Sequence, residues 1–180
     1  MAVLNFTKDL YFATSTVIDW IDLFTRPIYK RIVVDSLRYC QENKGLELYA
    51  WVLMSNHLHL IAGAKEGTSV SDILRDFKKY TSKQLVKAIQ ENQQESRKEW
   101  LIDRCGFLAA NDRKITYFKL WQEGSYIETI STYSFYEQKL NYIHMNPVRQ
   151  EITELPEEYL YSSARNYMGR KGLLDVIVMP

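Results

Sequence analysis

The chain has 180 residues, 46% of them hydrophobic, and a formal net charge of +1 from 23 lysines and arginines against 22 aspartates and glutamates. These values are typical of one globular domain with a buried core, and they exclude a protein held to nucleic acid by bulk positive charge alone. No apolar run is long enough to cross a bilayer, the first residues carry no secretory pattern, and Cys40 and Cys105 stand far apart. We therefore expect a cytoplasmic protein with reduced thiols and no membrane contact.

The first half of the chain alternates between strand and helix patterns. Runs of β-branched and aromatic residues predict strands, and apolar positions three to four residues apart predict helices. The predicted elements, in chain order, are a strand at 10–17, a helix capped by Thr25 that has Pro27 in its first turn and stops at Gly45, strands at 46–54 and 57–64 joined by a turn at Ser55-Asn56, and a long helix from Ser69 to about Ile89. On this last helix we expect Val70, Ile73, Phe77 and Tyr80 to form the stripe that faces the core.

The second half is less regular. Composition turns polar around 90–112, where we expect a loop or an irregular insertion, and about 150–180 we expect a turn-rich C-terminal extension. Between them the pattern predicts a strand or extended segment at 114–122 and a helix at 131–147. Pro147 should end this helix, because proline disfavours the helical conformation of the residue before it.

The sequence contains no recognisable linker and no internal repeat, so we treat residues 1–180 as a single domain. The order strand, helix, strand, strand, helix, followed by a further strand and helix, predicts an α+β fold of the ferredoxin-like sandwich type. In such a fold a central antiparallel sheet has helices packed on it, and alternate residues of each strand face opposite layers.

The segment MSNHLHLIAG (54–63) holds two of the chain's three histidines. Alternate residues of a strand share a face, so His57 and His59 should point one way while Leu58 and Leu60 point the other. Two neighbouring neutral imidazoles are half of a metal site. The alternative is a structural pair, either hydrogen-bonded in a partly buried position or exposed on an edge, and the spacing alone does not decide between the two.

The segment YIHMNPVR (142–149) is the second unusual stretch. Tyr142 and Asn146 share one helix face, whereas His144 points roughly the opposite way, which argues against His144 as a third ligand. The amide oxygen of Asn146 is suited to a divalent ion, and a tyrosine beside it can act as a nucleophile. In the alternative, which spacing alone favours, Tyr142 is a core aromatic and Asn146 is the C-cap of the helix.

A row of basic residues follows one side of the long predicted helix. Its members lie four residues apart, with one further lysine beside them, and they are Arg75, Lys79, Lys83 and Lys87, together with Lys78. Such a row is usually a solvated helix face, but it can also follow a phosphate backbone.

Four segments, in this order, resemble blocks of a known family. NHLHLI (56–61) resembles the HUH motif of single-tyrosine transposases, in which two histidines flank a large apolar residue. LWQEG (120–124), YIHMNPVR (142–149) and YSSARNY (161–167) are similar to blocks of the REP-associated tyrosine transposases, relatives of the insertion-sequence-200-like enzymes. The resemblance runs from about Tyr11 to Leu174, and it departs from the family pattern at Gln150-Glu151, where the family usually has Ala-Gly.

The resemblance implies a role for each matching residue. His57, His59 and Asn146 would be ligands of Mg²⁺ or Mn²⁺, and Tyr142 would be the nucleophile. The substrate implied is single-stranded DNA next to a palindromic hairpin, cleaved and rejoined through a 5′-phosphotyrosine. The basic row and Arg149 would then contact the DNA.

Three alternatives remain beside this transposase. A replication initiator or relaxase would share the chemistry, although the small size of the chain and the NPVR segment argue against it. A DNA-hairpin-binding regulator of the same fold would lack catalysis, and a generic protein would use the histidines structurally. The resemblance leaves the oligomeric state open, because relatives include monomers and homodimers.

Overall fold

The computed structural model describes residues 9–111 and 119–179, with side chains over 9–106 and 119–179. Within these residues one antiparallel sheet has the strand order β2-β3-β1-β4. Its strands are β1 (Leu10–Thr16), β2 (Leu46–Leu53), β3 (His57–Ala64) and β4 (Tyr126–Ile130). Helical crossovers join β1 to β2 and β3 to β4, which is the topology of the ferredoxin-like sandwich, so the predicted fold class is confirmed.

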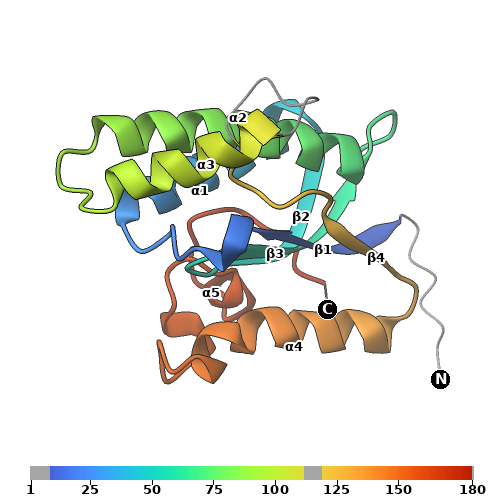
Figure 1. Ribbon diagram of the computed structural model, residues 1–180. Helices are drawn as coiled ribbons and strands as arrows, with labels where there is room; N and C mark the ends of the chain where they lie inside the picture. The colour runs from blue at the N-terminus through green and yellow to red at the C-terminus, as the bar shows by residue number, and fades with distance from the viewer. Residues whose placement is uncertain (1–8, 112–118, 180) are drawn as a thin grey trace.

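Helices cover both faces of this sheet (Figure 1). On one face lie α1 (Pro27–Asn43), α2 (Val70–Glu91) and α3 (Lys98–Asn111), and on the other lie α4 (Tyr133–Arg149) and the short α5 (Ala164–Tyr167). Two 3₁₀ turns, η1 (Ile18–Trp20) and η2 (Pro156–Glu158), connect the elements. In the described ranges, no helix combines the length and the apolar character that a bilayer crossing requires.

The two faces of the sheet have separate apolar cores, because alternate strand residues point to opposite layers. Leu58 and Leu60 of β3 pack with the α1–α3 layer. Ile61 belongs to the cluster under α4, together with Tyr136 and Ile143. The side chains of one strand therefore serve two different environments.

The predicted helix ends are right for α2 and partly wrong for α1. The Ser69 hydroxyl caps α2 by accepting a hydrogen bond from the backbone N–H of Asp72 at 3.1 Å. Thr25 does not cap α1, which begins after Arg26 without a side-chain cap. The Thr25 hydroxyl instead accepts a long hydrogen bond from Arg97. Tyr80 was wrongly placed in the buried stripe: it is 56% exposed, and the core position after Phe77 belongs to Thr81.

The expected loop or irregular insertion at 90–112 is wrong, because most of this stretch forms α3. Among the described side chains of this helix, Leu101 and Cys105, which are four residues apart, are buried. The connector between α2 and α3 is tied down by Glu95, whose buried carboxylate accepts hydrogen bonds from Arg26 at 3.0 Å and from Arg97 at 3.1 Å. Its polar composition thus reflects an ion-pair network as well as solvent exposure.

The strand or extended segment expected at 114–122 lies partly outside the described residues. In the described part, Trp121 forms a single bridge with Val17, and the fourth strand of the sheet is β4, further along the chain. Pro147 does not end α4, which continues to Arg149. The N–H of Gln150 bonds to the Asn146 carbonyl at 3.2 Å, and the N–H of Ile152 bonds to the Pro147 carbonyl at 2.9 Å. These bonds satisfy the last turn beyond the proline.

Candidate active site

The two histidines of β3 face α4, as the strand alternation predicted. His59 lies opposite Thr14 in the β1–β3 pairing, and His57 lies opposite Thr16. Both imidazoles are buried, while Leu58 and Leu60 fill the opposite core. The pair is therefore neither exposed on an edge nor part of the main core.

Tyr142 of α4 lies directly against this pair. The ring centroids of His57 and His59 are 4.6 Å apart, and those of His59 and Tyr142 are 5.2 Å apart. Phe12 of β1 stacks on His59 at 5.4 Å and meets Tyr142 edge-on at 6.0 Å. Tyr142 remains 38% exposed, so it is not the core aromatic of the alternative interpretation.

Hydrogen bonds fix the orientation of His57. The amide nitrogen of Asn56 donates to the Trp20 carbonyl at 3.3 Å and to the Asp22 carboxylate at 3.1 Å, which turns its oxygen toward His57. That oxygen lies 2.7 Å from Nδ1 of His57. Because an amide oxygen only accepts, Nδ1 carries the proton and Nε2 keeps its lone pair for a ligand role.

His59 is held in a similar way by Thr14. The Thr14 hydroxyl lies 2.8 Å from Nδ1 of His59, which leaves Nε2 on the other side of the ring. Burial, the neighbouring His57 and the positive charge of Lys139 lower the pKa of His59 to about 3. Burial also lowers the pKa of His57, and Asp22 partly opposes this effect. Both imidazoles are neutral at pH 7, the form in which histidine binds metals.

A network of hydrogen bonds links His57 to the α2–α3 connector. Asp22 accepts from Asn56 through its side chain, and its backbone carbonyl accepts from Arg97 at 2.9 Å. Arg97 is in turn held by the buried carboxylate of Glu95. Residues that are distant in the sequence therefore set the position of one imidazole.

Asn146 and His144 lie on different sides of α4. Asn146 is buried one turn beyond Tyr142, and its side-chain oxygen lies 3.5 Å from the Gln150 amide nitrogen. It is not the C-cap, a position held by Gln150. The His144 ring packs toward α5, where Nε2 lies 2.9 Å from the Ser163 hydroxyl, and burial lowers its pKa to about 4. The prediction that His144 points away from the site is correct.

In residues 9–111 and 119–179, no three histidine, cysteine, aspartate or glutamate side chains form a group suited to a metal ion. A three-ligand centre around the two imidazoles would thus need an oxygen donor of another kind, which the Asn146 amide offers. The ligand role of Asn146 stays a prediction.

A cavity of about 320 Å³ opens beside Tyr142, and we call it the tyrosine cavity. Its lining residues are Phe12, Thr14, His59, Tyr126, Gln138, Lys139 and Tyr142. The Lys139 ammonium lies 4.3 Å from the Phe12 ring centroid and forms a 2.9 Å ion pair with Glu128. Sequence reasoning missed Lys139, although its position three residues before Tyr142 places it on the same helix face.

Two other tyrosines bear on the choice of nucleophile. Tyr126 is 59% exposed and lines the same cavity, so it is the nearest alternative. Tyr136 is buried, its hydroxyl lies 2.7 Å from that of Tyr167, and burial raises its pKa strongly. Tyr136 is therefore not accessible to a substrate. The Arg149 guanidinium lies 5.5 Å from the Tyr142 ring centroid and places a fixed positive charge at the site.

The residues predicted to contact DNA do not all lie together in the structure. Arg149 lies on α4, whereas the basic row lies on α2, on the other face of the sheet (Figure 1). Arg75 pairs with Asp72 at 2.5 Å, and Lys87 lies 3.8 Å from Glu91. Lys78 donates to the backbone carbonyls of Gln122 and Gly124 instead of lying on the solvated face. Contact of these residues with DNA stays a prediction.

Comparison with known proteins gives a family match over part of the chain. Residues 21–108 match the family model described as IS200-like transposase. A solved structure of the REP-associated tyrosine transposase bound to a REP hairpin is 16% identical, with a TM-score of 0.58, and the match covers 100% of this chain and 93% of that one. At this identity the likeness shows a shared fold.

A second solved structure, a provisionally assigned transposase from Deinococcus radiodurans R1, is 15% identical, with a TM-score of 0.45 over 84% of this chain and 96% of that one. That likeness is too weak to add to the argument. No curated protein matched the sequence.

Proposed function

Residues 21–108 match the family model described as IS200-like transposase, and from that match we propose a specific activity for this chain. We propose that it cleaves and rejoins single-stranded DNA next to palindromic hairpins, with Tyr142 as the nucleophile. The hairpin substrate is suggested by the solved relative of the same fold, which is bound to a REP hairpin.

One observation carries this proposal. His57, His59 and Tyr142 come from a central strand and a distant helix, yet their rings form one continuous contact, with centroids 4.6 and 5.2 Å apart. Both imidazoles are oriented through Nδ1 by Asn56 and Thr14. A structural histidine pair needs no such contact with a half-exposed phenol.

The donor set fits a divalent cation. His57, His59 and the Asn146 amide would hold Mg²⁺ or Mn²⁺, and the two imidazoles favour Mn²⁺ because Mg²⁺ prefers oxygen ligands. A bound ion would polarise the phosphate and neutralise part of its charge. The outer partners Asn56 and Thr14 keep the two rings in place for this role.

The chemistry of the chain's own residues is a phosphoryl transfer. The Tyr142 hydroxyl oxygen forms a bond to phosphorus, and the bond between phosphorus and the 3′ oxygen breaks. The hydroxyl proton leaves Tyr142, and the departing 3′ oxygen gains a proton to become a free hydroxyl. Lys139 lines the tyrosine cavity and the Arg149 guanidinium lies 5.5 Å from the Tyr142 ring centroid, so both can stabilise the phosphate charge. The phosphotyrosine linkage conserves the energy of the broken phosphodiester bond. Attack on its phosphorus by a 3′ hydroxyl therefore rejoins the strand and releases Tyr142.

The test is the formation of a covalent protein–DNA adduct on a hairpin-bearing single strand with Mn²⁺. We expect the adduct in the wild type, none in Tyr142→Phe, and none with a chelator. Tyr126→Phe removes the same atom from the same cavity and should still form the adduct. An adduct that persists in Tyr142→Phe and disappears in Tyr126→Phe would transfer the nucleophile role to Tyr126.

The remaining alternative is a hairpin-binding regulator of the same fold without catalysis. Such a protein would bind the hairpin strand in both the wild type and Tyr142→Phe and would never form the adduct. That result would remove the catalytic proposal while leaving the match to the family model intact.

A further inference from the structure

A second, larger cavity lies on the face of the sheet opposite Tyr142. It has a volume of about 640 Å³ and is formed between α2 and the segment 119–127. We call it the basic cavity, because its charged lining consists of four cations and one carboxylate, namely Arg75, Lys78, Lys79, Lys119 and Glu123. Glu123 pairs with Lys119 at 3.0 Å, so the balance of charge in the lining is strongly positive.

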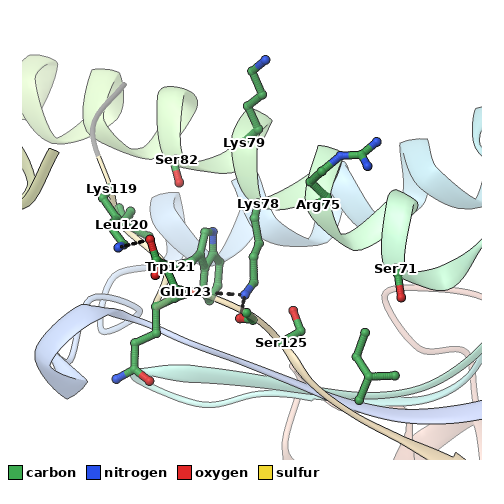
Figure 2. A pocket seen from close by; sticks show the side chains of 13 residues that line it. Ser71, Arg75, Lys78, Lys79, Ser82, Lys119, Leu120, Trp121, Glu123 and Ser125 are labelled. Atoms are coloured by element: carbon green, nitrogen blue, oxygen red, sulfur yellow. Dashed lines mark hydrogen bonds and ion pairs between the residues drawn. The ribbon is translucent and has the colours of Figure 1, made fainter. Parts of the chain in front are cut away.

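Lys78 is the centre of this cavity. Figure 2 shows its side chain reaching from α2 to the facing segment, while Arg75 and Lys79 project outward from the same stretch of helix. Its ammonium donates to the Gln122 carbonyl at 3.2 Å and also to the Gly124 carbonyl. An ammonium has three donors, so a third remains for an anion. Burial lowers the pKa of Lys78 to about 8, which still leaves it mostly charged at pH 7.

The two cavities share the strand β4 as their common wall. Tyr126 lines the tyrosine cavity, and the next residue, Ile127, lines the basic cavity, because successive strand residues point to opposite faces. In the described part of the chain β4 pairs only with β1, so it is an edge strand of the sheet. A strand that leaves the tyrosine cavity around this edge would enter the basic cavity, which Ile127 lines.

We propose that the basic cavity binds the phosphodiester backbone of an unpaired DNA strand that continues from the tyrosine cavity around the β4 edge. This inference rests on the proposed function and adds the course of the strand to it. The site is concave, and a positively charged groove with a nearby aromatic ring suits a single strand. Tyr126, which is 59% exposed at the crossing point, offers that ring.

The basic cavity divides the basic row of α2 into two halves. Arg75 and Lys79 line the basic cavity, whereas Lys83 and Lys87 are exposed further along the helix and do not line it. Each pair contributes two positive charges to the same helix. Two double variants, Arg75→Ala/Lys79→Ala and Lys83→Ala/Lys87→Ala, therefore change the net charge equally at different positions of the helix.

Binding is measured in a Tyr142→Phe background without divalent ions, so that cleavage cannot intervene. The probes are a DNA hairpin with an oligo(dT) extension on its 5′ side, the same hairpin extended on its 3′ side, and the hairpin alone. We expect Arg75→Ala/Lys79→Ala to lower the affinity for one extended hairpin roughly tenfold and to flatten its salt dependence by about two units of log–log slope. Its affinity for the bare hairpin should be unchanged, and Lys83→Ala/Lys87→Ala should match the parent on every probe.

Photo-crosslinking supplies an independent reading of position. A photoreactive thymine in the extension should crosslink to peptides from 119–127 in the parent, and this product should decline in Arg75→Ala/Lys79→Ala. Equal losses in the two double variants, or an equal loss on the bare hairpin, would overturn the proposal, since either result indicates charge or duplex contacts elsewhere.

Failure of this inference is distinct from failure of the catalytic proposal. Adduct formation in the wild type together with unaltered binding in Arg75→Ala/Lys79→Ala would refute only the basic cavity. Extension-dependent binding through Arg75 and Lys79 without any adduct would refute only the catalysis.

Discussion

The two faces of the sheet differ in what their residues are equipped to do. The face under α4 holds two neutral imidazoles, a half-exposed tyrosine and the single lysine of the tyrosine cavity. The face under α2 holds the larger cavity, lined by four cations. In our proposals, the first face cleaves and rejoins DNA, and the second face binds the unpaired DNA strand. In these proposals the edge strand β4 joins the two functions, because its successive side chains point to opposite faces of the sheet.

The largest expected effect is on the free energy of unfolding, and it distinguishes the core residues of β3 from its site residues. Leu60→Ala should reduce the free energy of unfolding by about 3 kcal/mol, because it leaves a cavity in the buried core of the α2 face. Mn²⁺ binding to the folded protein, measured by calorimetry, should be nearly unchanged. His59→Ala should show the reverse, with lost Mn²⁺ binding. If Leu60→Ala weakened Mn²⁺ binding as much as His59→Ala, the two faces would not be independent.

Thr14→Val tests the orientation of His59. The substitution keeps the side-chain shape and removes the hydroxyl that lies 2.8 Å from Nδ1. We expect Mn²⁺ affinity to fall about tenfold or more, because the ring loses the partner that fixes its orientation. Thr16→Val is the matched control, since Thr16 faces His57 across the β1–β3 pairing and its hydroxyl bonds to neither imidazole. Equal affinities in the two variants would show that Thr14 does not position the ligand.

Thr81→Val tests the attachment of the segment 119–127 to α2. The Thr81 hydroxyl accepts a 2.8 Å hydrogen bond from Nε1 of Trp121, whose ring is buried. Its removal leaves that N–H unpaired and should cost about 1–2 kcal/mol in urea unfolding. Ser36→Ala, which removes only a hydroxyl bonded back to the Ile32 carbonyl, should cost less. A smaller loss in Thr81→Val than in Ser36→Ala would mean that the Trp121 contact is not stabilising.

The smallest expected effect is on stability, when the two exposed cations of the basic cavity are replaced. Arg75→Ala/Lys79→Ala should leave the urea midpoint of unfolding essentially unchanged, because both side chains lie on the exposed face of α2 and surface ion pairs contribute little. A marked drop in the midpoint would mean that the DNA-binding loss of this variant reflects unfolding, and the binding comparison would then use Lys79→Ala alone.

The sequence predicted the parts of the fold with a clear period. Val70, Ile73 and Phe77 recur at helical spacing, and β3 alternates cleanly between His57, His59 and their leucine neighbours, so these elements and the common face of the histidines were predictable. The failures have local causes. Among its described side chains, helix α3 buries two in a polar stretch, and backbone bonds beyond Pro147 complete the end of α4.

Only part of the candidate site could be predicted from the sequence, for a related reason. Spacing along one element shows that Tyr142 and Asn146 share a face, but the partners that orient the histidines come from other elements. Asp22 and Asn56 are 34 residues apart in sequence. No period within one strand or helix predicts such contacts, because they depend on how η1, β3 and the α2–α3 connector pack together.

The separation of His57 and Tyr142 along the chain has a consequence during synthesis. A ribosome adding about 5–20 residues per second makes the histidine strand several seconds before it makes α4. The last described segment also returns to the sheet, where the N–H of Ile177 bonds to the Leu48 carbonyl at 2.9 Å. A nascent chain can therefore pair β2 and β3 before Tyr142, the proposed nucleophile, has been synthesised.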